Sequence, residues 1–272
     1  MSVLFFNILL LASAFAWLRI AGRVLAQRPI LPRSECERGR LDLVVPVMAL
    51  ILWIAIPKII QAVLQAVLVG SNEAEPSLVD ETGIERVKVA CFATALFISV
   101  MPLLLLITPS SSLNPSQSSF APFGITLTDW RSQVVDGASG FIACLLPVCA
   151  TLWATDSLRS KEALHPFLKL LSESPETSTV LWISVSAVLL APLAEELLFR
   201  VVLQGWLEQH LSRPAAIGLV AVAFSAFHPF PDGLPLFPLA LVLGYVYSQR
   251  HSYLAVVTLH ALFNGLNLLI AI

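Results

Sequence analysis

The chain has 272 residues, of which 57% are hydrophobic and only 12% are charged, and its mean hydropathy is +0.83. Soluble domains carry about 25% charged residues, so this chain lacks the polar residues to cover a water-facing surface of its size. The composition excludes an ordinary soluble protein and favours one whose outer surface faces lipid. The formal net charge of −2 gives no sign of a nucleic-acid partner.

Eight apolar segments have the length, or nearly the length, of a membrane helix, which needs about 20 apolar residues. The alternating pattern typical of barrel strands does not occur, so the sequence predicts an all-α bundle with about eight transmembrane spans. The predicted spans are 3–22, 42–69, 88–108, 136–155, 179–204, 214–230, 234–250 and 253–272. We expect a multi-pass integral membrane protein, in the plasma membrane if the chain is bacterial, with the lipid bilayer as a partner.

The basic residues of the N-terminal region follow the first span rather than precede it. Arg19, Arg23, Arg28 and Arg33 all come at the end of that span or after it, which favours an uncleaved first span over a signal peptide. Lysine and arginine concentrate in cytoplasmic loops, so this loop is predicted to be cytoplasmic. With eight spans, the loop after residue 204 and the turn near Arg250 would lie on the same side.

The linkers between the spans differ in composition. Residues 70–87 are acidic, and 109–135 form a linker that is rich in serine and proline at its start. In 156–178, apolar and charged residues alternate at helical spacing, which predicts a segment lying at the membrane interface.

The first group of ionisable residues inside an apolar segment is APLAEELLFRVVL, residues 191–203. A charge at mid-membrane costs about 2.5–3.5 kcal/mol on insertion scales, so such residues normally line an internal cavity. Glu196 and Arg200 are four residues apart and can form an ion pair on one helix face. Glu195 points about 100° away from Glu196 and stays free for acid–base chemistry. The alternative is an ion-pair cluster at a helix end.

The second group is AFSAFHPF, residues 223–230, near the end of another apolar segment. His228 follows Phe224 by one helical turn, and Pro229 and Pro231 break the helix after it. Taken alone, a histidine at such a position is more often an interfacial anchor than a catalytic group.

The third group lies in the last span, where Asn264 follows His260 by four residues and faces the same way. Taken alone, this pair is typical of hydrogen bonding between membrane helices. Together, the three groups supply a carboxylate, two imidazoles and a carboxamide. These groups are sufficient to activate a water molecule and to stabilise an oxyanion.

The ordered motifs resemble the pattern EExxxR, FxxxH and HxxxN or HxxxD of the CAAX-protease and bacteriocin-processing family, over about residues 179–270. The matching residues are Glu195, Glu196, Arg200, Phe224, His228, His260 and Asn264. The resemblance implies an intramembrane endopeptidase similar to the type II CAAX prenyl endopeptidase. It implies that Glu195 activates water with help from His228, and that His260 and Asn264 stabilise the oxyanion. The remaining motif residues would support the site.

A metal site is an alternative use of the same residues. Glu195, His228 and His260 have the composition of a His₂Glu zinc site, in which zinc would lower the pKa of its water. Glu196 would then have to act as the base, although it is expected to pair with Arg200, and no HExxH motif is present. We favour direct activation of water by Glu195, and a divalent metal such as zinc stays an open alternative.

Two further functions stay open beside an endopeptidase that cuts a membrane-associated peptide or protein. A non-catalytic membrane scaffold or immunity factor would keep the fold without cleaving anything. A transporter would use intramembrane acids and histidines but predicts two related halves with broken helices, which the sequence lacks. We divide the chain into 1–135, with spans and linkers of unassigned role, and 136–272, a transmembrane catalytic region with its core at 179–270.

Overall fold

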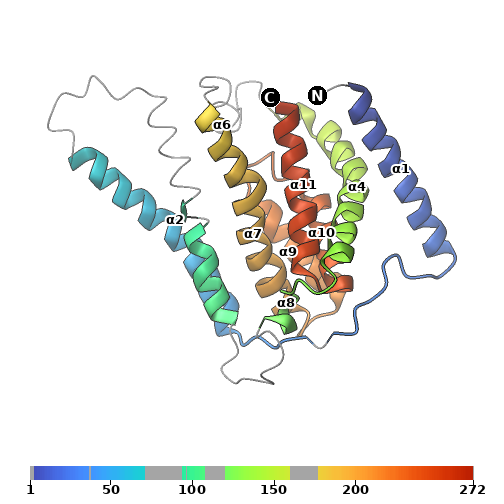
Figure 1. The fold of residues 1–272 in the computed structure, drawn as a ribbon, viewed down its shortest axis with the longest axis horizontal. Coiled ribbons are helices and arrows are strands. Elements are labelled where there is room, and N and C mark those ends of the chain that lie inside the picture. Colours follow the sequence, from blue (N-terminus) through green and yellow to red (C-terminus); the bar gives the residue numbers. More distant parts are fainter. Residues whose placement is uncertain are drawn as a thin grey trace.

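The computed structural model describes residues 3–36, 38–70, 94–95, 97–107, 120–159 and 177–271. Within these ranges the regular structure is helical and contains no strand, as the long apolar segments without an alternating pattern predicted (Figure 1). The elements are α1 (Val3–Leu25), α2 (Val44–Gly70), a helix over Phe97–Ile107, η1 (Ala121–Phe123), α4 (Trp130–Ala154), η2 (Asp156–Leu158), α6 (Thr177–Ser184), η3 (Val185–Leu190), α7 (Ala191–Glu196), η4 (Leu197–Gln204), α8 (Gly205–Leu207), α9 (Arg213–Ala226), α10 (Leu236–Arg250) and α11 (Tyr253–Ala271).

Five of the described helices are long and apolar enough to cross a membrane, so the protein is a multi-pass integral membrane protein. They are Val3–Leu25, Val44–Val63, Trp130–Ala154, Val180–Leu207 and Tyr253–Ile270. All eight predicted spans contain helix, but the other three helices are shorter. The 14 residues of α9 and the 15 of α10 reach roughly 21–23 Å at 1.5 Å per residue, against about 30 Å of hydrocarbon. These two helices form a hairpin behind α7 and α11 (Figure 1).

The fourth predicted span begins six residues earlier than expected, at Trp130 instead of residue 136. The sequence places residues 109–135 in a linker, but polar residues in the first two turns of α4 have partners that stabilise the start of this helix. The Gln133 amide donates to the carbonyls of Thr126 (3.0 Å) and Thr128 (2.6 Å). The Asp136 carboxylate accepts a hydrogen bond of 2.6 Å from Arg250. The acidic linker and most of the predicted interfacial segment lie outside the described residues.

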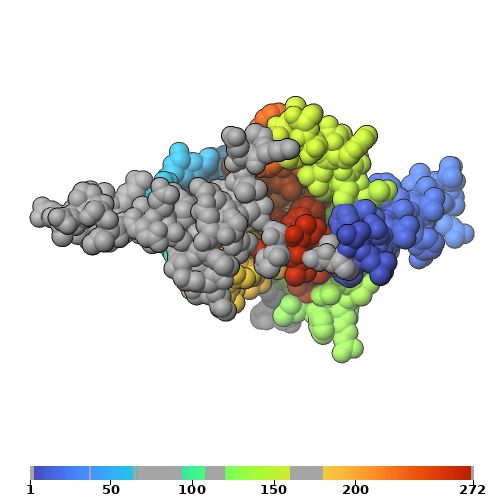
Figure 2. Space-filling model, turned by 90° about the horizontal axis from the view of Figure 1, so that it is seen from above, coloured from blue at the N-terminus to red at the C-terminus, as the bar shows by residue number. Residues whose placement is uncertain are grey.

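The last helix, α11, lies in the middle of the molecule when seen from above (Figure 2), and α4 packs against both α11 and α1. Two glycines let α4 approach it closely. A Cβ atom on Gly137 would lie 2.4 Å from the Ala255 carbonyl oxygen, and one on Gly140 would lie 2.5 Å from the Leu259 side chain. A larger residue at Gly137 would push α4 away from the helix that carries His260, because the backbone cannot give way, whereas at Gly140 the Leu259 side chain would have to move.

The first helix is attached to α4 where a proline interrupts the hydrogen bonding of α4. Pro147 has no N–H, so the carbonyl of Ala143, four residues earlier, loses its helical donor. The indole of Trp17 donates to this carbonyl at 2.9 Å. The Leu146 N–H donates to the Ser13 hydroxyl at 3.0 Å. These two polar contacts fix the depth of α1 against the bundle.

Residues 177–207 form one long helix, but two stretches of it have wider, π-type turns. In these stretches a backbone N–H reaches the carbonyl five residues earlier, as from Ala191 to Ser186 after η3 and from Gly205 to Arg200 after η4. Such turns are rare and often occur at functional sites. The short α-helical segment α7, which ends with Glu195 and Glu196, lies between them.

Candidate active site

The candidate site lies where the helix of residues 177–207 meets α9 and α11. Glu196 is fully buried, and each of its carboxylate oxygens has a partner. One oxygen accepts a hydrogen bond of 2.9 Å from Nε of Arg200, which is the ion pair expected from their spacing. The other lies 2.8 Å from Nδ1 of His260. Glu196 therefore joins two of the three sequence motifs.

Arg200 is also fully buried, although it carries a permanent charge. Its guanidinium carbon lies 5.2 Å from the centre of the Phe224 ring, so a cation–π contact adds to the ion pair. Its two terminal nitrogens have no hydrogen-bond acceptor among the described residues. A buried cation with so few partners depends strongly on the carboxylate of Glu196.

Glu195 is the more accessible of the two carboxylates. Its side chain is 13% exposed, whereas that of Glu196 is 0% exposed. One oxygen of Glu195 lies 3.9 Å from Nε2 of His260, and the carboxylate is also within electrostatic reach of His228. The two adjacent carboxylates therefore have different surroundings, as the sequence predicted, and both face His260.

The two histidines of the motifs pack against the same aromatic ring. The centre of the Phe224 ring lies 5.0 Å from that of His228 and 5.8 Å from that of His260. Nδ1 of His228 is 2.8 Å from the backbone carbonyl oxygen of Phe224. Since a carbonyl only accepts, this nitrogen carries the proton, and a neutral His228 presents a lone pair at Nε2.

Asn264 lies one helical turn beyond His260, but it also has a structural partner. Its amide nitrogen donates to the carbonyl of Ala187 at 2.8 Å. In the wide turns of η3 this carbonyl would receive the N–H of residue 192, which is a proline and has none. Asn264 supplies the missing donor and keeps one N–H for another acceptor.

Aromatic residues that the sequence analysis did not single out surround the site. The fully buried Phe199 makes edge-to-face contacts with Phe224 (5.0 Å between ring centres), Phe227 (5.6 Å) and Trp53 (6.4 Å). Trp53 belongs to α2, so the N-terminal region takes part in packing around the candidate site. Sequence reasoning missed these residues because aromatic residues are common throughout an apolar chain.

Tyr253, at the start of α11, was also missed. Its hydroxyl donates a hydrogen bond of 2.5 Å to the carbonyl of Leu193, two residues before Glu195. One tyrosine at a helix start carries no sequence signal that would predict this contact.

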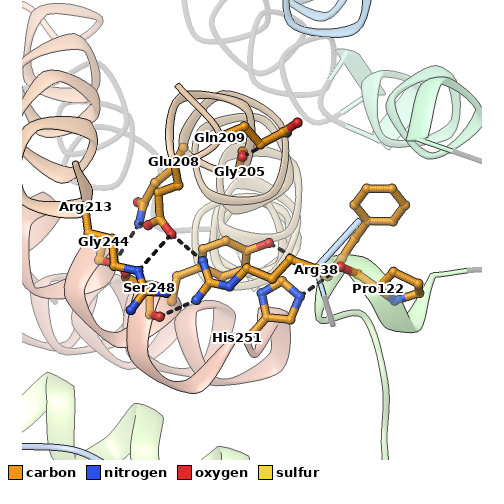
Figure 3. A network of polar contacts seen from close by, with 12 residues as sticks. Arg38, Pro122, Gly205, Glu208, Gln209, Arg213, Gly244, Ser248 and His251 are labelled. Atoms are coloured by element: carbon orange, nitrogen blue, oxygen red, sulfur yellow. Dashed lines mark hydrogen bonds and ion pairs between the residues drawn. The ribbon is translucent and has the colours of Figure 1, made fainter. Parts of the chain in front are cut away.

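A second polar network lies beyond the end of the same helix and includes the loop after α1 (Figure 3). The guanidinium of Arg38 donates to the Glu208 carboxylate and to the carbonyl of Ser248. The Gln204 amide donates to the other Glu208 oxygen at 2.8 Å, and the Leu41 N–H donates to the Gln209 side chain at 3.3 Å. The N-terminal loop is therefore bound to the helix that carries Glu195.

His251 lies at the edge of this network, between α10 and α11 (Figure 3). Its Nε2 donates to the carbonyl of Pro122 at 2.9 Å. Burial lowers the pKa of His251, and the nearby Arg38 cation lowers it further, while the carbonyl and Glu208 act in the opposite direction. On balance, the lowered pKa favours the neutral form of the imidazole.

A metal ion does not fit the observed arrangement of the predicted ligands. Among the described residues, no three His, Cys, Asp or Glu side chains are grouped so that they could hold a metal ion. Both imidazoles do have the Nδ1 contact that orients many metal-binding histidines. However, Glu195, His228 and His260 do not form such a group, so the reaction proposed below has no metal-bound step.

Comparison with known proteins finds a family model that matches the segment containing these residues. Residues 177–266, about a third of the chain, match the family model of the type II CAAX prenyl endopeptidase, Rce1-like. No curated protein and no solved structure matches the chain. The matched segment includes all three motifs and agrees with the resemblance seen in the sequence. The C-terminal segment of this membrane protein is thus similar to the type II CAAX prenyl endopeptidases over residues 177–266.

Proposed function

We propose that the chain is an intramembrane endopeptidase that hydrolyses a peptide bond of a membrane-associated protein or peptide. The observation that carries this proposal is the contact between the three motifs. Within the family-matched segment, Glu195 and Glu196 both face His260, and His228 shares the ring of Phe224 with His260. Burying such a set of polar groups in an apolar bundle costs free energy, which favours a functional role for them.

Glu195 is the proposed general base. It is the more exposed carboxylate, and 3.9 Å separate it from Nε2 of His260. One water molecule about 2.8 Å from each atom would bridge this distance. Glu195 would accept a proton from this water as its oxygen attacks the scissile carbonyl carbon. The lone pair at Nε2 of His228 is a second acceptor that would orient the water.

His260 is the proposed oxyanion donor. The two carboxylates carry two negative charges and Arg200 carries one positive charge, so a protonated His260 makes the buried group neutral. Nδ1 then donates to Glu196, and the N–H at Nε2 is available to the oxygen of the tetrahedral intermediate. The second N–H of Asn264 would add to this stabilisation. Glu195 finally returns the proton to the leaving amine.

The depth of these residues supports a substrate that reaches the membrane interior. His260 is seven residues after the start of α11, roughly 10 Å along the helix from that end. Glu195 is twelve residues before the end of α8, roughly 18 Å along its own helix from that end. The scissile bond would therefore enter the hydrocarbon region, which a peptide anchored to the membrane does more readily than a soluble one.

The test uses purified protein in liposomes and two quenched-fluorescent probes. One is a farnesylated peptide with a CAAX end, and the other is an apolar span with a short peptide tail. We expect wild-type protein to cleave one of them, and Glu195→Gln, His228→Ala and His260→Ala each to reduce kcat/KM at least about a hundredfold. Turnover at the wild-type rate by all three variants would reject the assignment.

His210 offers a matched control for His228. Its Nδ1 contacts the carbonyl of the aromatic residue four positions earlier, Trp206, at 3.0 Å, and its ring is tilted against that residue in the same way. His210 lies outside the three motifs, so His210→Ala should keep the wild-type rate. If both histidine variants lose activity equally, the effect of His228 is on the fold and not on the reaction.

Two further outcomes separate the alternatives. A metal-dependent enzyme would lose activity on chelation and recover it with zinc, whereas we expect no change. A scaffold or immunity factor would cleave neither probe, and its biological effect would survive the three substitutions.

A further inference from the structure

We propose that Tyr253 is a positioning residue that fixes the orientation of Glu195 and Glu196. This inference rests on the proposed function, whereas the hydrogen bond from which it is argued does not depend on that function. The hydroxyl of Tyr253 donates a hydrogen bond of 2.5 Å to the carbonyl of Leu193, inside the short segment α7.

The carbonyl of Leu193 lies where the hydrogen-bond pattern of the helix changes. The N–H of Leu197 is shared between the carbonyls of Leu193 and Ala194, so the carbonyl of Leu193 does not have this helical donor to itself. The wide, π-type turns of η4 begin at Leu197. A carbonyl oxygen can accept two hydrogen bonds, and the Tyr253 hydroxyl fills the capacity that the irregular helix leaves open.

This position matters because a helix turns by about 100° per residue. If the change from α-type to π-type turns moved by one residue, Glu195 and Glu196 would rotate relative to His260. The carboxylates would then lose their separate partners. A donor fixed to α11, the helix that also carries His260, resists this shift.

Contacts of both the backbone and the side chain fix the position of Tyr253. Its backbone N–H donates to the carbonyl of Gly124 at 2.9 Å, and its side chain packs against the main core. Asn264 makes a comparable contact at the other end of α11, with the carbonyl of Ala187. α11 therefore donates side-chain hydrogen bonds to the irregular helix on both sides of His260, and the Tyr253 contact is the one nearer in sequence to Glu195.

Tyr247 provides a matched control within the same chain. It is also a buried tyrosine whose hydroxyl donates to a backbone carbonyl, that of Phe123, at 3.0 Å. Phe123 lies in η1, outside the helix of the two glutamates. Phenylalanine at either position removes one hydroxyl and keeps the ring.

The experiment measures Tyr253→Phe, Tyr247→Phe and Glu195→Gln in liposomes with the peptide probe that wild-type protein cleaves. We expect Tyr253→Phe to lower kcat about five- to tenfold, the size of one hydrogen bond, with KM within about twofold. Hydrogen–deuterium exchange of residues 191–204 should rise in this variant. Tyr247→Phe should keep both kcat and the exchange of this segment.

Each outcome decides one of the two proposals. If Glu195→Gln is inactive while Tyr253→Phe matches wild type or Tyr247→Phe in kcat, the role of Tyr253 is refuted and the proposed function stands. If Glu195→Gln is active, the proposed function fails, and hydrogen exchange alone decides whether Tyr253 fixes the helix. Where Tyr253→Phe does not accumulate, difluorotyrosine at position 253 keeps the shape and loses its donor proton at high pH. The rate should then fall with rising pH, and an unchanged pH profile would refute the role.

Discussion

At the scale of single residues, the site is a buried group of charges whose members depend on one another. Glu196 contacts both Arg200 and His260, and all three are almost fully buried. In such a group, removal of one charge leaves the others without compensation, whereas removal of a pair does not. Stability and reactivity are therefore coupled at Glu196 but separable at Glu195, whose partly exposed side chain makes no hydrogen bond to the described residues.

We expect Glu196→Gln to destabilise the protein by about 3–5 kcal/mol, because it leaves the Arg200 cation buried without a carboxylate. Thermal unfolding in detergent measures the effect. The double variant Glu196→Gln with Arg200→Met should be more stable than Glu196→Gln alone. Equal losses for the single and double variants would show that the pair is not coupled.

At the scale of helices, the loop after α1 contributes to the stability of the protein through the network around Glu208. The side chain of Glu208 is only 4% exposed, and Arg38 is its nearest cation, with Arg213 farther away at 3.9 Å. This network holds the end of the helix that carries the two glutamates. The division of the chain at residue 135 stays a prediction, and these contacts cross it.

Arg38→Ala should destabilise the protein by about 1–3 kcal/mol, because the buried carboxylate of Glu208 keeps its charge and loses a donor. The control is Arg33→Ala, since Arg33 is exposed on the same loop. Thermal unfolding of both variants in detergent checks this prediction. An equal effect of the two substitutions would show that loop charge, and not the contact with Glu208, is responsible.

The same network predicts a dependence of stability on pH. The pKa of His251 is lowered by burial from its ordinary value of 6.5, so the unfolded chain binds a proton that the folded one does not. This contribution is present above about pH 6.5 and is lost as the pH falls through the folded pKa. His251→Asn keeps a residue that tolerates the left-handed backbone found here (φ 46°) and should reduce the acid sensitivity of unfolding. His210→Asn should not reduce it.

At the scale of the whole molecule, the exposed arginines gather at one end of the bundle. The loop after α1 contacts residues 208–209 and 248–250, which we expected on the same side of the membrane. The first turn of α1 and the last turn of α11 lie at the opposite end (Figure 1). Because arginine and lysine favour the cytoplasmic side, the arginine-bearing end should face the cytoplasm.

Labelling of single cysteines in intact cells tests this orientation. In a chain whose other cysteines are replaced, Cys36 at the arginine-bearing end should be protected from an impermeant maleimide until the cells are opened. Ser157→Cys, on the exposed η2 at the other end, should react in intact cells. The reverse pattern would invert the orientation.

The sequence alone predicted the class of fold, the helices and the association of three motifs. It succeeded because long apolar segments have few other structures in lipid, and because spacings of four residues specify shared helix faces. It did not predict the wide turns of η3 and η4, since leucine, valine and phenylalanine fill α-type and π-type turns equally well. It also missed Tyr253 and Arg38, because contacts over 60 and 170 residues leave no local pattern.

The short α9–α10 hairpin has a consequence for how solvent reaches the reaction. The 14 residues of α9 rise roughly 21 Å, about 9 Å less than the hydrocarbon thickness of a bilayer, and the segment that follows, residues 227–235, is bound near the end of α4 by the ion pair of Arg159 and Asp232 at 3.3 Å. Any backbone groups of this segment that lie within the hydrocarbon are not tolerated against acyl chains, so protein or water must cover them. His228 lies in this segment, and the proposed hydrolysis consumes one water molecule for each bond that is cut. A bilayer of longer lipids would lengthen the path from bulk solvent to this histidine, so we expect the turnover of the proposed endopeptidase to fall as the membrane becomes thicker.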